Sequence, residues 1–174
     1  DEPLTTSELF DDYITRLFVA MVGEDTLTTH FALRHPENYG IESADVSLGE
    51  YYASYSEEEH QKLLDYYYEL LDYGEMIEEL TGDQRITYRV LEDYIKIQLN
   101  YDKEEYFYFQ EPLKPKSGTQ TMLPVSMVEY SFSGPEDIET YLKLLECIPG
   151  YFRQIEEFEK KKSEAGMFMS DETA

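Results

Sequence analysis

The residues best suited to chemistry in this sequence are three histidines and one cysteine: His30, His35, His60 and Cys147. A zinc site needs His, Cys or carboxylate ligands that converge, usually at a signature spacing. His30 and His35 stand five residues apart, about 140° around a helix, so they do not share a face. The sequence contains no HExxH, CxxC or HxH pattern. It therefore predicts no metal ligand and no bound cofactor in this chain.

A nucleophilic active site is not indicated either. No GxSxG motif occurs, and Cys147 lies near the end of a predicted helix, where the helix dipole does not favour a thiolate. Cys147 is interpreted as a buried structural residue. The acidic runs 57–59 and 156–157 are expected to be solvated helix faces, because 38 acidic residues make any single pair of carboxylates uninformative. No catalytic residue is predicted.

Candidate contact residues lie between positions 112 and 132. Lys114 and Lys116 give the only local relief from negative charge, and Gln120 belongs to the same predicted loop. With Tyr130, they are predicted as contacts to a substrate or partner. The tyrosine-rich runs DYYYELLDY and YFYF allow two interpretations: an aromatic platform for sugars or peptides, or amphipathic packing between helices.

Composition narrows the classes of partner. The 174 residues carry 38 Asp and Glu against 14 Lys and Arg, for a formal charge of −24. Such a surface repels nucleic acids and anionic membranes, so neither is expected as a partner. No stretch approaches the roughly 20 apolar residues of a membrane span. The single cysteine allows no intrachain disulfide and leaves the compartment open.

Helical periodicity predicts an all-α array of about six to seven amphipathic helices with αα-hairpins. Capping boxes are expected at Thr5 with Glu8 and at Ser56 with Glu59, and Gly166 is expected to end the last helix. The predicted helices cover about 5–22, 25–34, 56–80 (weakened at Gly74), 84–101, 125–132, 135–148 and 149–166. In the 84–101 helix, the residues expected to face inward are Ile86, Val90, Leu91, Tyr94, Ile95 and Leu99.

Between the helices, about 102–124 is predicted to be one long extended loop, with a short strand or hairpin at Tyr106 to Phe109, because prolines interrupt it and no helical period continues. Ser170 followed by acidic residues has the chemistry of a helix start, after which the sequence stops. We therefore expect 1–174 to be a single helical region of a larger protein, truncated near a helix start.

Three segments resemble a known family. They are DTLTTHFALRHPENYGI, PLKPKSGTQTMLPVSMVEYSF and DIETYLKLLECIPGYFRQIEEFEKKKSEAGMFMS, densest in the G-T-Q-x-x-L-P segment at Gly118 to Pro124 and in the order of motifs from Tyr141 to Ser170. Together they resemble the N-terminal third of the bacterial domain of unknown function 885 family.

The resemblance implies a mostly helical parent several times longer, similar to zinc metallopeptidases with an HExxH helix in its C-terminal part. That zinc site would lie outside this chain, so no family catalytic residue transfers to a position here. The region would then be a non-catalytic wall of the substrate channel, with the remainder of the parent and a peptide substrate as partners. A secreted or lipid-anchored location is implied, with the cytoplasm as the alternative. The alternative function is a stand-alone acidic, tyrosine-rich binding module.

Overall fold

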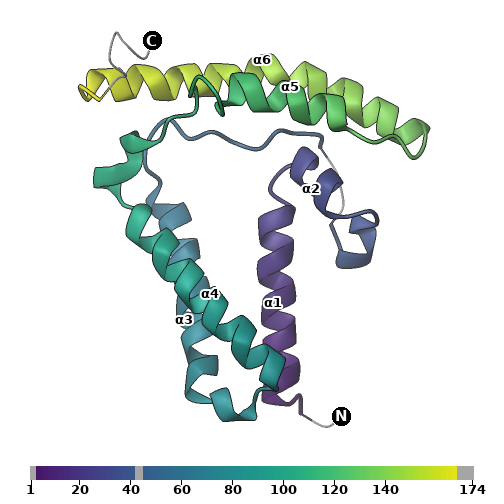
Figure 1. Cartoon of the computed structure of the whole chain (residues 1–174), viewed down its shortest axis with the longest axis vertical. Helices are drawn as coiled ribbons and strands as arrows, with labels where there is room; N and C mark the ends of the chain where they lie inside the picture. The colour runs from purple at the N-terminus through teal and green to yellow at the C-terminus, as the bar shows by residue number, and fades with distance from the viewer. Residues whose placement is uncertain (1–2, 42–44, 168–174) are drawn as a thin grey trace. The chain divides into compact units, whose positions relative to one another are not determined.

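The computed structural model describes residues 3–41 and 45–167, and within these ranges the chain is helical without any strand (Figure 1). This confirms the predicted all-α fold. The α-helices are α1 (Thr6–Val22), α2 (Thr26–Ala32), α3 (Glu57–Glu75), α4 (Gly82–Tyr101), α5 (Thr119–Glu129) and α6 (Pro135–Glu164), and the 3-10 helices are η1 (Pro36–Tyr39), η2 (Ile77–Glu79) and η3 (Glu104–Phe109). The helix start predicted at Ser170 lies outside the described residues.

The chain divides into two compact units, each assembled from two separate stretches. Unit 1 contains Asp1–Met21 and Tyr55–Phe107, and unit 2 contains Val22–Ser54 and Tyr108–Ala174. The prediction that the chain is one helical region of a larger protein stays a prediction.

The helices of unit 1 begin where side chains cap them. The Thr5 N–H donates to Glu8 Oε2 at 2.8 Å, which confirms the first capping box. Ser56 Oγ accepts from the Glu59 N–H at 3.3 Å, and Thr81 forms a further capping box with Gln84. Such caps satisfy N–H groups that the first turn of a helix leaves unpaired. Helices α3 and α4 then pack as the expected αα-hairpin (Figure 1).

The core of unit 1 is rich in tyrosine. Tyr13 donates its hydroxyl to the Tyr66 carbonyl at 2.9 Å, and Tyr73 donates to the Leu9 carbonyl at 3.1 Å. Both rings therefore bury apolar area while the hydroxyl stays hydrogen-bonded. The buried residues of this core are Phe10, Tyr13, Leu17, Leu70, Tyr73, Leu80, Tyr88 and Ile95. Among the residues of the DYYYELLDY run, buried Tyr73 fits the packing interpretation, whereas Tyr68 is exposed.

The inward face predicted for α4 is partly wrong. Ile86, Val90 and Tyr94 are exposed, whereas Tyr88 is buried. The cause is Gln84, whose Nε2 donates to the Ser7 carbonyl at 2.9 Å and to Asp11 Oδ1 at 2.7 Å. These bonds turn the polar Gln84 side toward α1 and leave a second apolar side of α4 outside.

The break between α3 and α4 also lies earlier than predicted. Helix α3 ends at Glu75 instead of running to position 80, and α4 begins at Gly82. A Cβ added at Gly74 would stand 2.3 Å from Tyr88 Oη. Gly74 therefore provides the space in which the Tyr88 ring crosses α3.

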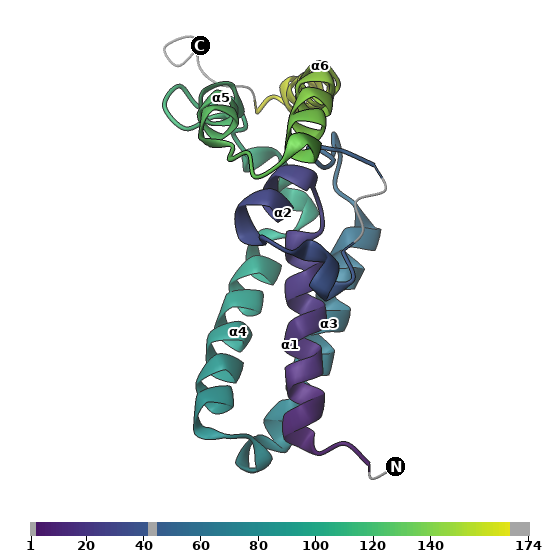
Figure 2. The ribbon, with the colours of Figure 1, turned by 90° about the vertical axis from the view of Figure 1, so that its right-hand side faces the viewer.

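In unit 2, α5 and α6 lie side by side, joined by the short connection 130–134 (Figures 1 and 2). One core cluster of unit 2 contains buried Leu123, Met127, Tyr130 and Leu144, with Leu27, Val46, Leu48, Tyr141, Ile148 and Phe152 packed around them. Helix α6 ends as predicted: Gly166 has φ 74°, and its N–H donates to the Ser163 carbonyl at 2.9 Å. The left-handed conformation is one that glycine adopts without steric cost.

Two predictions about residues 102–166 are wrong. The supposed extended loop 102–124 contains the 3-10 helix η3, where a strand or hairpin was expected, and it ends at Thr119, where α5 begins. The helices predicted as 135–148 and 149–166 are one helix, α6, with Pro149 inside it. Pro124 and Pro149 are both exposed, so water can satisfy the carbonyl that each proline leaves unpaired.

Candidate functional site

The predicted contact residues Lys114 and Lys116 are exposed in the turn 112–118 before α5, whereas Pro112 and Gly118 at its ends are buried. Lys114 Nζ stands 3.9 Å from Glu111 Oε2, a loose ion pair on the surface. Exposed ion pairs of this kind contribute little free energy. The ammonium groups of Lys114 and Lys116 are therefore available to an incoming acidic group. Their role as contacts stays a prediction.

Gln120 and Gly118 build that turn. Gln120 Nε2 donates to the carbonyls of Leu113 at 3.3 Å and Lys114 at 2.8 Å, and the Gly118 N–H donates to the Lys114 carbonyl at 2.9 Å. A Cβ at Gly118 would stand 2.5 Å from the Lys114 nitrogen and 2.6 Å from its oxygen. Leu123 of the same segment is buried. Gly118, Gln120 and Leu123 of the G-T-Q-x-x-L-P segment therefore each stabilise the fold of unit 2.

Tyr130, the fourth predicted contact residue, is buried rather than on the exposed turn. Its ring stacks on His30 with centroids 3.7 Å apart and planes 5° apart. His30 Nε2 accepts a hydrogen bond from the Ser131 N–H at 3.3 Å, which requires that nitrogen to be unprotonated. Burial raises the pKa of Tyr130, with a smaller contribution from Asp137. Tyr130 directly follows the end of α5, whereas Lys114, Lys116 and Gln120 lie before or in its first turn.

The three histidines have separate partners. His35 Nδ1 lies 3.0 Å from Glu37 Oε1 on the surface, and His60 Nδ1 lies 3.0 Å from Asp102 Oδ2 between the start of α3 and the end of α4. Within 3–41 and 45–167, no group of three His, Cys, Asp or Glu side chains could hold a metal ion. Sequence reasoning missed the His60–Asp102 pair because 42 residues separate the two.

A buried polar cluster in unit 2 also escaped sequence reasoning. Glu159 is 7% exposed, and neither carboxylate oxygen has a hydrogen-bond partner in the part of the chain that the structure describes. One turn further along α6, buried Lys162 donates to the Gln110 carbonyl at 2.6 Å. Gln110 Oε1 accepts from the Tyr51 hydroxyl at 3.1 Å, and Gln154 Oε1 accepts from the Tyr51 N–H at 2.6 Å.

This cluster is closed to a substrate. Both oxygens of Glu159 are shielded from solvent, and the Lys162 ammonium is occupied by a carbonyl. Burial raises the pKa of Tyr51, with smaller contributions from Tyr151 and Glu159. The cluster ties the segment around Tyr51 and the segment around Gln110 to α6, and its chemistry is that of an interior network.

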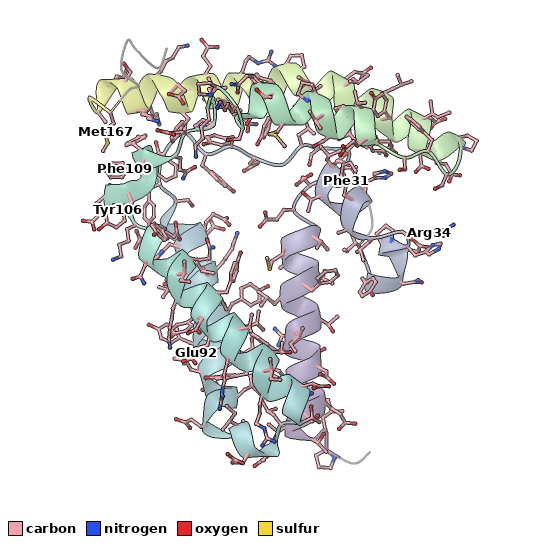
Figure 3. All side chains as sticks on the ribbon, in the orientation of Figure 1. Phe31, Arg34, Glu92, Tyr106, Phe109 and Met167 are labelled. Atoms are coloured by element: carbon pink, nitrogen blue, oxygen red, sulfur yellow. The ribbon has the colours of Figure 1, made fainter. Side chains whose placement is uncertain are left out.

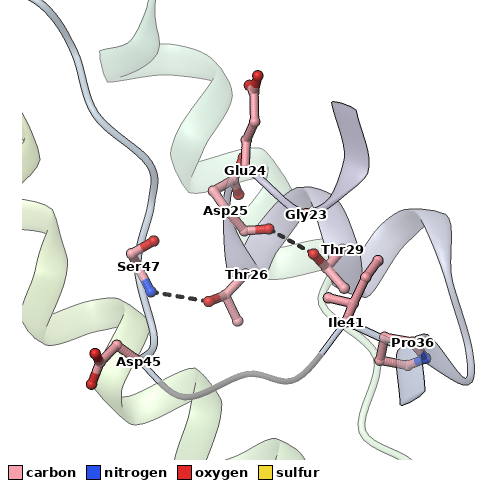
Figure 4. A pocket seen from close by; sticks show the side chains of 9 residues that line it. All are labelled: Gly23, Glu24, Asp25, Thr26, Thr29, Pro36, Ile41, Asp45 and Ser47. Atoms are coloured by element: carbon pink, nitrogen blue, oxygen red, sulfur yellow. Dashed lines mark hydrogen bonds between the residues drawn. The ribbon is translucent and has the colours of Figure 1, made fainter. Parts of the chain in front are cut away.

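A small cavity lies beside the start of α2 (Figure 4). Its volume is about 100 Å³, and its lining residues are Gly23, Glu24, Asp25, Thr26, Thr29, Pro36, Ile41, Asp45 and Ser47. Two of its hydroxyls are engaged: Thr26 Oγ1 accepts from the Ser47 N–H at 3.0 Å, and Thr29 Oγ1 donates to the Asp25 carbonyl at 2.9 Å. Ligand pockets usually measure about 300–1,000 Å³, so this cavity fits a few waters rather than a peptide.

Exposed apolar side chains are the most conspicuous feature of the surface of unit 2. Helix α6 exposes Ile138, Leu142 and Leu145, which follow each other at intervals of four and three residues on one side, and Val128 of α5 is 86% exposed. We call Ile138, Leu142 and Leu145 the α6 stripe. Contiguous exposed apolar side chains commonly mark a contact with another protein.

The chain matches no protein-family model, no curated protein and no solved structure. None of the helices in the described ranges is both long and apolar enough to cross a membrane.

Proposed function

We propose that this chain is a non-catalytic helical region of a larger zinc-metallopeptidase-like bacterial envelope protein, where it shapes one wall of the substrate channel. The observation that carries the proposal is the α6 stripe of Ile138, Leu142 and Leu145, exposed on a helix that already packs its other side against α5. Apolar area left in water is unfavourable by roughly 25 cal/mol per Å², so a covering element is expected.

The position of the family resemblance supports the same conclusion. Its densest parts, 118–124 and 141–170, belong to unit 2, which also carries the α6 stripe. Gly118 and Gln120 hold the turn that presents Lys114 and Lys116. A channel wall needs such exposed side chains on a fixed backbone rather than a nucleophile of its own. The zinc of the parent protein and its general base would belong to the remainder.

The gene itself gives the first test. The proposal expects the reading frame to continue past Ala174 into a segment that encodes an HExxH helix. A stop codon at that point would overturn it. The purified 174-residue chain is expected to hydrolyse no peptide, with or without added zinc, and zinc-dependent hydrolysis by this chain alone would contradict the non-catalytic role.

A capture experiment tests the α6 stripe. When the downstream remainder is expressed with the 174-residue chain, the two are expected to co-purify, and Leu142→Asp is expected to abolish capture. The matched control is Tyr68→Asp on α3, because Tyr68 is equally exposed but belongs to unit 1. Equal capture of the two variants would remove the α6 stripe from the contact.

A further inference from the structure

The chain crosses between its two units at three places, and α6 holds the unit 2 segments beside two of them. At the crossing after Ser54, Lys161 Nζ donates to Ser54 Oγ at 2.6 Å. Tyr51 of the same segment and Tyr108, which follows the other crossing, both pack against Phe158 of α6, with ring centroids 5.3 and 5.7 Å away. Phe158 is fully buried. The C-terminal half of α6 therefore contacts both segments.

Hydrogen bonds join the same two segments to α6 and to each other. Lys162 Nζ donates to the Gln110 carbonyl at 2.6 Å, and Gln110 Oε1 accepts from the Tyr51 hydroxyl at 3.1 Å. The Tyr51 N–H donates in turn to Gln154 Oε1 of α6 at 2.6 Å. Phe109, labelled in Figure 3 near the C-terminal end of α6, directly precedes Gln110 in the chain. The bonds begin and end at α6, so an opening at Lys162 loosens both segments.

Glu159 offers Lys162 a second acceptor. Its carboxylate is buried and has no hydrogen-bond partner among the described residues. Glu159 stands three residues before Lys162 on α6, about 60° around the helix and about 4.5 Å along it. Glu and Lys at this spacing form ion pairs on helices. Burial raises the pKa of Tyr51, and the charges of Tyr151 and Glu159 add to this rise, so the carboxylate lies close to the same cluster.

We propose that Lys162, Gln110 and Tyr51 form a latch with two states. In the closed state, which the structure shows, the Lys162 ammonium holds the Gln110 carbonyl. In the open state the ammonium turns to the carboxylate of Glu159, and water takes its place at the carbonyl, which belongs to an exposed residue. The ion pair gained then offsets the hydrogen bond lost. Opening frees the backbone beside the two crossings, so the latch controls how freely the chain turns there.

Hydrogen exchange of the full 174-residue chain tests the latch on peptides that cover 49–56 and 106–113. Glu159→Gln removes the charged acceptor but keeps the shape of the side chain, so exchange in both peptides should slow by about two- to tenfold. Adding Lys162→Met to that variant removes the ammonium as well. Exchange in both peptides should then be at least about fivefold faster than in Glu159→Gln alone. Equal or faster exchange in Glu159→Gln than in the unchanged chain would overturn the proposal.

A further variant separates the latch from a general gain in stability. Tyr51→Phe removes the hydroxyl that joins the two segments and leaves the ring on Phe158. In this background Glu159→Gln should slow exchange in 106–113 only, because the bond that carries the effect to 49–56 is gone. A general gain in stability would slow exchange in both peptides, and that result would overturn the latch.

The matched controls are Glu157→Gln and Lys160→Met, two exposed positions in the same half of α6. Lys160 Nζ binds Glu156 Oε1 at 2.6 Å on the surface. Both variants should exchange as the unchanged chain does, and a change as large as that of Glu159→Gln would count against the latch. Circular dichroism confirms that each variant keeps its helices. The proposed function is tested on the reading frame and on the α6 stripe, so its failure would leave the latch standing.

Discussion

Replacing Gly118 by alanine should destabilise unit 2 by about 2–4 kcal/mol. The φ of Gly118 is −76°, so the backbone conformation itself would accept alanine. The obstacle is space: the new Cβ would stand 2.5 and 2.6 Å from the backbone nitrogen and oxygen of Lys114. Overpacking of this kind costs about 1–3 kcal/mol. Moving the turn would also weaken the Gly118 and Gln120 hydrogen bonds to Lys114, at about 0.5–1.5 kcal/mol each.

Gly150→Ala is the matched control, because Gly150 also belongs to unit 2 but lies inside α6. Its added Cβ would meet only the Arg153 guanidinium, at 3.7 Å. Alanine in a helix interior is favoured over glycine by about 0.8–1.0 kcal/mol, so this variant should be more stable than the unchanged chain. The same substitution thus has opposite signs at two positions of one unit.

Urea unfolding followed by circular dichroism measures both effects, and thermal unfolding should show Gly118→Ala lowering the midpoint by about 5–12 °C. If Gly118→Ala were as stable as the unchanged chain, the turn 112–118 would not need a glycine there. The structural explanation of the G-T-Q segment would then be wrong.

Three further variants and conditions have defined outcomes. Glu159→Met should raise the free energy of unfolding by about 1–4 kcal/mol in urea titrations, because it removes a buried carboxylate that has no partner among the described residues; a loss of stability would show that the charge is satisfied. Burial raises the pKa of Tyr13 and Tyr51. The neutral rings therefore stabilise the folded chain below pH 10.0, the ordinary pKa of tyrosine, and this stabilisation is lost as the pH rises above that value. In an alkaline titration, tyrosinate absorbance should appear together with unfolding. Thr81→Ala should cost about 0.5–2 kcal/mol through loss of the α4 capping box, whereas Thr87→Ala, inside the same helix, should change the urea midpoint little.

The parts of the fold that could be predicted are those with a local cause. Thr5 with Glu8, Ser56 with Glu59, and Gly166 each fix a helix end through bonds that span only a few residues. Proline is the exception among local signals. Pro149 was expected to divide a helix, but it sits on the exposed side of α6, where the loss of one backbone bond is tolerated.

The candidate site divides in the same way. Lys114 and Lys116 lie between helices, as the prolines and the glycine around them predicted, whereas Gln120 lies in α5 and not in the predicted loop. Glu159 could not have been distinguished from 37 other acidic residues, because its burial depends on segments more than 40 positions away. Tyr130 looked like a contact residue because tyrosine serves equally well at surfaces and in cores, and its stacking on His30 is a contact between residues 100 positions apart.

The buried side of α4 was predicted wrongly for a physical reason. Ile86, Val90 and Tyr94 have the same helical period as the residues that are buried, so periodicity alone gives two equally apolar sides. Gln84 decides between them, because its amide fits only where the Ser7 carbonyl and the Asp11 carboxylate can receive it. Packing within unit 1 needs only one of the two sides. The second apolar side therefore adds nothing to the core of unit 1, and its side chains stay exposed although their spacing along the helix is that of a buried face.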